Sequence, residues 1–411
     1  MKFELTLKIL LFSALFLSSC KTVLIYPAPT LDLSTPPVED EISMPLMETS
    51  VEEILNESAS PSGVCVINEI PDVLNCFDIN GDLISSLQVP GIGSADPQGL
   101  HIAGAVGSAT IPPVVYYSLA AEQSLLHIEK GNALPLRKTN TFLAMAGVPE
   151  HPILAFSDLV FDDSIPHSFL YAGSLQTLSS SKPFFEMIDT KMGMALMPIA
   201  VEAAGSQAGK VWYTHSAWEI SGEDRVFPIN SGLYVFDLKT GQVSQVLGAE
   251  RNFQGLSPDK SQAGSISLDI KGDHFMRVTD LLTGQTTIFP LDPTSSRGAG
   301  YAVFSIDGKY AAWLEASGSL LAEPPNFQVL IRIGDIENGS LDQKIDPSAV
   351  SQVLNWKKVS FIRPVGWLNP QVLVIEVHGN EPNTKALIKY DISIGNLQIL
   401  CQGSFAGFSY Q

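Results

Sequence analysis

The strongest constraint on the fold is a short element, an Asp followed by three residues and then a Gly, that recurs along most of the chain. Each copy separates two runs rich in aliphatic, aromatic and β-branched residues, which are typical of strands. An Asp side chain accepts hydrogen bonds from nearby backbone N–H groups, and Gly takes the positive φ that closes a turn, so each copy predicts a tight hairpin. Five full copies and two degenerate ones are present: Asp189/Gly193, Asp237/Gly241, Asp280/Gly284, Asp335/Gly339, Asp391/Gly395, Asp78/Gly81 and His127/Gly131.

A second turn signature lies upstream of several of these hairpins. It is clearest in Phe304-Ser-Ile-Asp-Gly308, with echoes at Leu256-Ser-Pro-Asp-Lys260, Phe161-Asp-Asp and Trp367-Leu-Asn-Pro370. Each repeat then contains four strands, A to D, with this signature between A and B and the Asp-Gly turn between C and D. Repeats of about 52 residues with four strands favour an all-β, seven-bladed β-propeller. Six or eight blades remain alternatives, because residues 139–160 and 190–210 do not divide cleanly into strands.

These two signatures resemble the TolB-type, WD-like propeller repeats of bacterial envelope proteins. The resemblance covers residues 63–411 and implies a propeller, in which the motif residues shape turns rather than perform chemistry. The C-terminal segment 403–411 is expected to supply strand A of the blade whose other strands are 64–67, 73–78 and 83–89. Such pairing would remove an open sheet edge.

The cysteines of the first blade lie on its proposed B and C strands. Cys65 and Cys76 are expected to face one another across a hairpin, where a disulfide is feasible, and two buried thiols are the alternative. Cys401 has no evident partner.

The first twenty residues resemble a bacterial lipoprotein signal peptide. Lys2 and Lys8 precede an apolar run that ends in Leu17-Ser-Ser-Cys20, a lipobox-like sequence. The resemblance implies a signal peptide at 1–20, a lipid-anchored Cys20, and a domain outside the cytoplasm on the outer membrane or the outer face of the cell membrane. A plain signal peptide is the alternative. Residues 21–62 are acidic and rich in Pro, Ser and Glu, which predicts a disordered tether.

The charge and chemistry of the chain narrow the classes of function. Its 43 acidic and 24 basic residues give a net charge of -19, which argues against a nucleic-acid partner. The seven histidines lack ligand spacing, and no catalytic motif occurs, so we expect no metal, no cofactor and no recognisable catalytic residue.

Long connections between strands B and C should gather on one face. We assign 217–230, 317–326 and the shorter 175–182 to such connections, and insertions confined to one face often mark a binding surface. The candidate binding residues are Trp218, Glu219, Glu223, Asp224, Arg225, Phe227, Leu321 and Glu323. The alternative is that the apolar ones fold back onto the blades.

The sequence therefore predicts a lipid-anchored, extracytoplasmic propeller that acts as a binding or scaffolding module. It would contact the membrane through its lipid. Its binding partner would be an envelope protein or an extracellular peptide or glycan. Two alternatives stay open. One is a propeller lyase or hydrolase that uses carboxylates such as Glu219, Glu223 and Asp224, and the other is a structural part of a larger envelope complex.

Overall fold

The fold is seen in a computed structural model of the chain. It describes residues 60–410 except 69–71, 92–99, 104–113, 120–122, 130–131, 150, 190–192, 218–225, 268–274, 320–321, 323–325 and 382–383. All the described residues belong to one compact unit, Asn56–Gln411. Among them no helix has the length and apolar character needed to cross a membrane.

The described part of the chain consists almost entirely of antiparallel strands. Three four-stranded sheets, in order from first to last strand, are β27(Ser404–Ser409)-β1(Gly63–Asn68)-β2(Val73–Asp78)-β3(Leu83–Gln88), β4(Leu100–Ala103)-β5(Val114–Leu119)-β6(Ser124–Glu129)-β7(Asn132–Lys138) and β8(Thr141–Gly147)-β9(Ile153–Asp162)-β10(Ile165–Ser174)-β11(Phe185–Ile188). Two more are β19(Ala299–Phe304)-β20(Tyr310–Ser317)-β21(Gln328–Asp335)-β22(Ser340–Ile345) and β23(Val359–Asn369)-β24(Val372–Gly379)-β25(Lys385–Asp391)-β26(Asn396–Gln402). A larger sheet contains β12(Met194–Ala204), β13(Gln207–Ala217), β14(Asn230–Asp237), β15(Gln242–Leu256), β16(Gln262–Ser267), β17(Phe275–Asp280) and β18(Thr286–Pro290).

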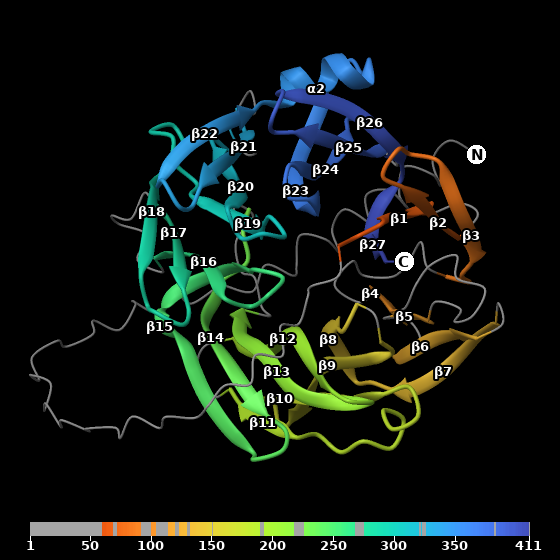
Figure 1. Cartoon of the computed structure of the whole chain (residues 1–411). Coiled ribbons are helices and arrows are strands. Elements are labelled where there is room, and N and C mark those ends of the chain that lie inside the picture. Colours follow the sequence, from red (N-terminus) through yellow and green to blue (C-terminus); the bar gives the residue numbers. More distant parts are fainter. Residues whose placement is uncertain are drawn as a thin grey trace, which may run out of the picture. The chain divides into compact units, whose positions relative to one another are not determined.

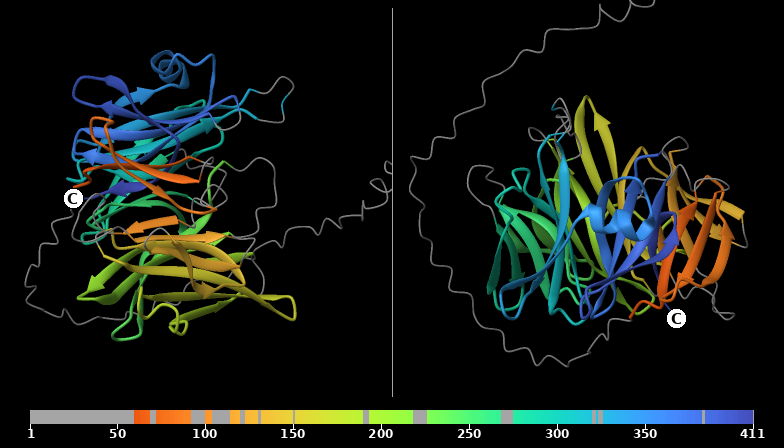
Figure 2. Two further views of the ribbon diagram at one scale, coloured as in Figure 1. Left: turned by 90° about the vertical axis from the view of Figure 1, so that its right-hand side faces the viewer. Right: turned by 90° about the horizontal axis from the view of Figure 1, so that it is seen from above.

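Within the unit 56–411 the sheets follow one another around a common centre, which is the arrangement of a β-propeller (Figure 1). The first strand of a sheet lies toward the centre and the last toward the rim. Side views show strands that run between two opposite faces (Figure 2). Because successive strands are antiparallel, A–B and C–D connections open on one face, and B–C and D–A connections open on the other.

The last strand of the chain pairs with the first. β27 is antiparallel to β1, with Val64 opposite Phe408, and β1 continues the sheet through β2 and β3. This is the strand order expected from the sequence. Cys65 lies opposite Cys76 in the next pair of strands, and the two form a disulfide bond.

The number of separate sheets differs from the seven blades that the sequence predicts. Five sheets have four strands each, and the sixth has seven strands. The cause is β15, which is long enough to pair with both β14 and β16. Its first half pairs with β14, as at Phe236 and Val243, and its second half pairs with β16, as at Phe253 and Ser265.

The Asp-Gly element forms the expected hairpin at most of its positions. Asp237 accepts the backbone N–H groups of Lys239 and Thr240 at 2.9 Å each, and Gly241 closes the turn with φ of 72°. Equivalent turns follow strands β2, β17, β21 and β25. In the second signature, Ser305 Oγ donates to Asp307 and accepts the Tyr310 N–H, which fixes the A–B turn.

Two assignments from the sequence are wrong. Asp189 and Gly193 lie between β11 and β12 of different sheets, where Asp189 accepts the Met194 N–H at 2.6 Å, so the same capping chemistry serves a different connection. Phe161-Asp-Asp belongs to the β9–β10 hairpin, which is a B–C rather than an A–B turn. The degenerate copy at His127 does mark the C–D hairpin between β6 and β7, although His127 itself lies within β6.

The core lies between neighbouring sheets. Both faces of a central strand are covered, so nearly every residue of β20 is buried, Glu315 included. The short helix α2(Pro347–Leu354) joins β22 to β23 and packs its buried Val350 and Leu354 against this core. It ends at Asn355, which has the left-handed φ of 53°.

Candidate functional site

The structure describes only one of the binding residues predicted from the sequence. Cys20, Trp218, Glu219, Glu223, Asp224, Arg225, Leu321 and Glu323 lie outside the described residues. Phe227 is half-buried, and its ring lies 5.8 Å from that of Tyr301. It therefore packs back onto the neighbouring sheet, which was the alternative reading for this residue.

The predicted placement of the long connections is correct for two of the three. Residues 217–230 join β13 to β14 and 317–326 join β20 to β21, so both are B–C connections. The segment 175–182 instead joins β10 to β11, which makes it a C–D connection on the opposite face. Arg137 holds this segment, because its Nη1 donates to the carbonyls of Leu178 and Ser181 while its guanidinium lies 4.1 Å from the Tyr171 ring.

A charged pair joins β23, the inner strand of its sheet, to the next strand, β24. Arg363 of β23 and Glu376 of β24 are cross-strand partners, and Arg363 Nε donates to Glu376 Oε2 at 2.6 Å. The Glu376 side chain is 3% exposed and that of Arg363 is 27% exposed. The carboxylate is thus enclosed, while the guanidinium reaches the surface.

The surroundings of Glu376 keep it ionised. Burial alone would raise the pKa of the Glu376 carboxyl, but the neighbouring His378, the charge of Arg363 and the Phe405 N–H outweigh burial and lower the pKa to about 2. Phe405 donates to Oε1 at 3.0 Å, and His378 Nε2 lies 3.7 Å from the same oxygen. Glu376 is therefore a fixed negative charge rather than a proton carrier at neutral pH.

The guanidinium of Arg363 is only partly used by this pair. Its Nε is engaged, whereas Nη1 and Nη2 donate no hydrogen bond to any residue that the structure describes. The Tyr301 ring lies 6.0 Å from the guanidinium carbon, and the Phe361 ring lies 5.7 Å from that of His378. We call Arg363, Glu376, His378, Tyr301 and Phe361 the Arg363 cluster.

Tyr301 is held in an unusual backbone conformation. Its φ of 54° is left-handed, which is costly for an aromatic residue, and it lies in the irregular part of β19 between Gly300 and Val303. Its hydroxyl donates to the Val226 carbonyl at 3.3 Å, and its N–H donates to Gln254 Oε1 at 3.4 Å. These contacts fix the Tyr301 ring beside Arg363.

The Arg363 cluster lies toward the face on which the B–C connections open. Tyr301 and Phe405 are in the early, D–A halves of the inner strands β19 and β27. Arg363 and Glu376 lie near the middle of β23 and β24, and His378 lies next to the last residue of β24, toward its B–C end. The cluster and the two long connections therefore share one face. In the sequence, the signal for this cluster was that one Arg and one Glu, Arg363 and Glu376, interrupt two successive apolar strands.

Two other buried carboxylates have a structural role. Glu315, which is 0% exposed, accepts hydrogen bonds from the Trp313 indole, the Ser295 hydroxyl and the Asp292 N–H. Asp158 accepts the N–H groups of Asn140 and Thr141 at the start of β8. Each carboxylate thus fixes, by hydrogen bonds, the chain segment that leads into the first strand of the sheet to which the carboxylate belongs.

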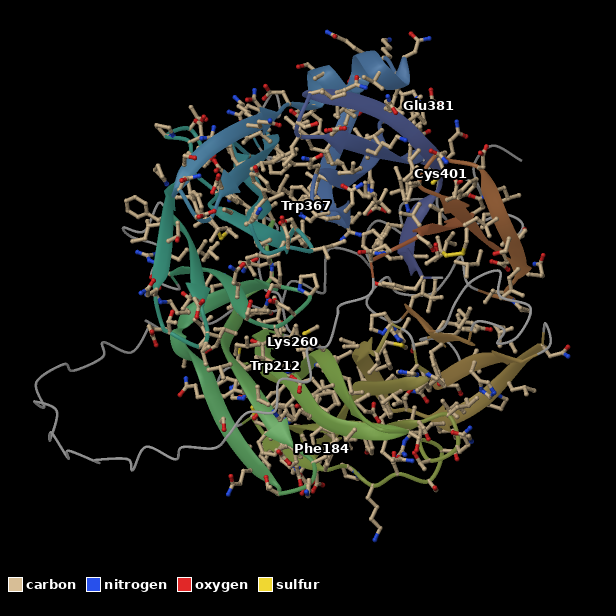
Figure 3. The ribbon with its side chains drawn as sticks, viewed as in Figure 1. Phe184, Trp212, Lys260, Trp367, Glu381 and Cys401 are labelled. Carbon is tan, nitrogen blue, oxygen red and sulfur yellow. A yellow bond between two sulfur atoms is a disulfide. The ribbon has the colours of Figure 1, made fainter. Side chains whose placement is uncertain are left out.

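The opposite ends of the inner strands line two open cavities of mixed polar and apolar character. One cavity of about 200 Å³ is lined by Trp367, Phe304, Leu256 and Phe408, and another of about 280 Å³ by His101, Met145, Ile199 and Phe408. Trp367 lies on the inner side of its sheet (Figure 3). Burial lowers the pKa of His101 to about 4, so the ring is neutral at pH 7.

The described residues contain no cluster of three or more His, Cys, Asp or Glu side chains that could hold a metal ion. The remaining cysteine, Cys401, is buried, and burial raises the pKa of its thiol to about 12. A thiol in this state is a poor nucleophile.

Comparison of the sequence with known protein families and with curated proteins finds no match. Solved structures do resemble it. TolB from Acinetobacter baumannii is 16% identical, with 84% of this chain and 80% of TolB covered and a TM-score of 0.38. An oligogalacturonate lyase from Vibrio parahaemolyticus is 12% identical, with 80% and 91% covered and a TM-score of 0.47.

A prolyl endopeptidase is 10% identical to the chain, with a TM-score of 0.51. The match covers 80% of this chain and 46% of the endopeptidase, so it spans about half of that protein. At such identities a likeness shows the fold alone. The chain is an all-β protein with a β-propeller fold, and TolB proteins are among the structures similar to it.

Proposed function

We propose that this protein is a lipid-anchored, extracytoplasmic β-propeller that binds a partner on the face where its B–C connections open. The observation that carries the proposal is the Arg363 cluster. Its guanidinium is fixed through Nε and has two nitrogens left for a ligand, on the same face as the connections 217–230 and 317–326. A preorganised donor beside long loops is typical of a recognition surface.

The proposed propeller has seven blades, two of which share β15. An Asp-Gly hairpin at Asp237 leads into the first half of β15, as such hairpins lead into strand D elsewhere. The second half leads into a turn in which Ser257 Oγ donates to Asp259 and accepts the Gln262 N–H. Ser305 and Asp307 form the same turn after β19, so the second half of β15 has the character of strand A.

The proposed anchor rests on the sequence. The lipobox-like Leu17-Ser-Ser-Cys20 would place acyl chains on Cys20, and the acidic residues 21–62 would tether the propeller outside the cytoplasm. The partner would be an envelope protein or an extracellular peptide or glycan, because a net charge of -19 disfavours nucleic acid.

Mass spectrometry of the protein from its native membrane, after mild cross-linking, tests this proposal. We expect an acylated Cys20 peptide and a stoichiometric partner joined through 217–230 or 317–326. An unmodified Cys20 would contradict the anchor. Cross-links confined to the C–D turns would contradict the proposed binding face.

A carboxylate-based lyase or hydrolase remains the second candidate. Its predicted residues Glu219, Glu223 and Asp224 lie outside the described residues. This candidate predicts turnover of an oligosaccharide or peptide substrate that is lost when these acids become amides, whereas a binding module predicts no turnover.

A further inference from the structure

We infer that the Arg363 cluster is a binding site for a carboxylate group, carried by an organic acid or by an acidic group of the partner. The inference rests on the proposed binding face and names the chemistry recognised there. Its central observation is an arginine whose Nε is held by a buried carboxylate and whose Nη1 and Nη2 have no protein acceptor among the described residues.

The geometry suits a planar oxyanion. A guanidinium presents its donors as a rigid fork that matches two carboxylate oxygens, and a fixed side chain loses little entropy when it binds. Glu376 supplies that fixation, since it is 3% exposed and receives both Arg363 Nε at 2.6 Å and the Phe405 N–H at 3.0 Å. The two nitrogens of Arg363 that remain, Nη1 and Nη2, are therefore held in place before a ligand arrives.

The local charge favours one negative charge on the ligand. Arg363 and Glu376 compensate each other, and His378 Nε2, 3.7 Å from the carboxylate, adds a positive charge only when it is protonated. A bound monoanion adds one negative charge beside the buried carboxylate of Glu376, whereas a dianion such as phosphate adds two. This balance argues for a carboxylate.

The neighbouring rings favour an organic group behind that carboxylate. Tyr301 lies 6.0 Å from the Arg363 guanidinium, and its ring is fixed by the bond from its hydroxyl to Val226. Phe361 lies on the His378 side of the cluster. These rings offer apolar surface to the body of an acid whose carboxylate meets Arg363.

Fluorine NMR with 4-fluorobenzoate, and with neutral 4-fluorobenzamide as its isostere, tests the inference on the purified full chain. We expect 4-fluorobenzoate to bind, the amide not to bind, and acetate to displace the probe more effectively than inorganic phosphate. Arg363→Lys should weaken binding about tenfold or more, because lysine retains the charge beside Glu376 but loses the fork.

Arg251→Lys is the matched control. The Arg251 side chain is 30% exposed, and its Nε lies 3.8 Å from Glu250 Oε1. It should leave binding unchanged. Equal binding of the amide, equal displacement by phosphate, or full binding by Arg363→Lys would each overturn the inference. If Arg363→Lys does not fold, protection of Arg363 from phenylglyoxal by benzoate in the native protein replaces the variant, and absence of protection overturns the inference.

The two proposals fail separately. If 4-fluorobenzoate does not bind but cross-links still form through 217–230 or 317–326, the ligand class is wrong and the binding face stands. If the probe binds through Arg363 while partners attach only at the C–D turns, the carboxylate site stands and the proposed partner face is wrong.

Discussion

Glu376 shows how a single residue can be both buried and ionised. Desolvation opposes its charge, and the charge persists because Arg363, His378 and the Phe405 N–H surround both carboxylate oxygens. Phe405 belongs to β27 and Arg363 to β23, so one carboxylate links two inner strands of different sheets. Glu376 therefore both stabilises the contact between these strands and holds Arg363, on which the proposed ligand binding depends.

Replacing Glu376 by Gln should destabilise the protein by about 3 kcal/mol at pH 7, because Arg363 loses its charged partner. The folded pKa of Glu376 is about 2, below its ordinary value of 4.5. The stabilisation is thus fully present above pH 4.5 and disappears as the pH falls toward 2. Urea denaturation at several pH values should show the difference between wild type and variant shrinking below pH 4.5.

Glu186→Gln is the control for this measurement. Glu186 pairs with His167 at 2.7 Å, but its side chain is 46% exposed. Its loss should change stability by less than about 1 kcal/mol. A deficit for Glu376→Gln that is as large at pH 3 as at pH 7 would contradict the assignment of an ionised Glu376.

At the scale of elements, turns were the most predictable features of the chain. An Asp-Gly element specifies a hairpin through contacts within five residues, so Asp237 and Gly241 could be assigned without knowledge of the fold. The same local chemistry misled at Asp189, because an Asp can cap a connection between sheets equally well. Local contacts define a turn but do not say which strands it joins.

The Arg363 cluster was much less predictable than the turns. Arg363 and Glu376 meet only because the register of β23 and β24 places them opposite one another, and Tyr301 reaches them from another sheet. Register across a bulged pair is not evident from hydrophobic pattern alone. Residues 175–182 were misplaced because the preceding Phe161-Asp-Asp turn was taken as an A–B turn, whereas it joins strands B and C and makes the next connection C–D.

Deleting residues 404–411 tests the role of β27. The deletion exposes the edge of β1 and removes Phe405 and Phe408, which pack with Val64 and Val66. We expect a loss of at least about 5 kcal/mol in a single cooperative unfolding transition. Calorimetry measures this loss, with a variant that lacks only Gln411 as the control. An unchanged melting curve for the longer deletion would refute the pairing of β27 with β1.

The disulfide between Cys65 and Cys76 makes a second prediction for the same sheet. Its ends are 11 residues apart in the sequence, and closing such a loop stabilises a fold by about 3 kcal/mol. The double variant Cys65→Ser, Cys76→Ser should lose about that amount in chemical denaturation. Reductant should destabilise the wild type and leave the double variant unchanged; an equal effect on both would argue against the bond.

At the scale of the whole propeller unit, the antiparallel strands separate two faces with different chemistry. The A–B end of the inner strands lines two open cavities around Trp367 and Phe408 and holds no ion pair like that of Arg363 and Glu376 among the residues that line them. The D–A end carries the Arg363 cluster and lies with the long B–C connections. A polar, preorganised site beside long loops is the reason we place the partner on the second face.

Photo-cross-linking from each face, in cells that produce the protein, tests the proposed binding face most directly. One probe replaces Asp162, which is exposed in the B–C turn between β9 and β10, and the other replaces Glu337, exposed in the C–D turn between β21 and β22. We predict that a discrete partner is captured from position 162 and not from 337, and that Arg363→Lys reduces the capture. Capture from position 337 alone would contradict the account.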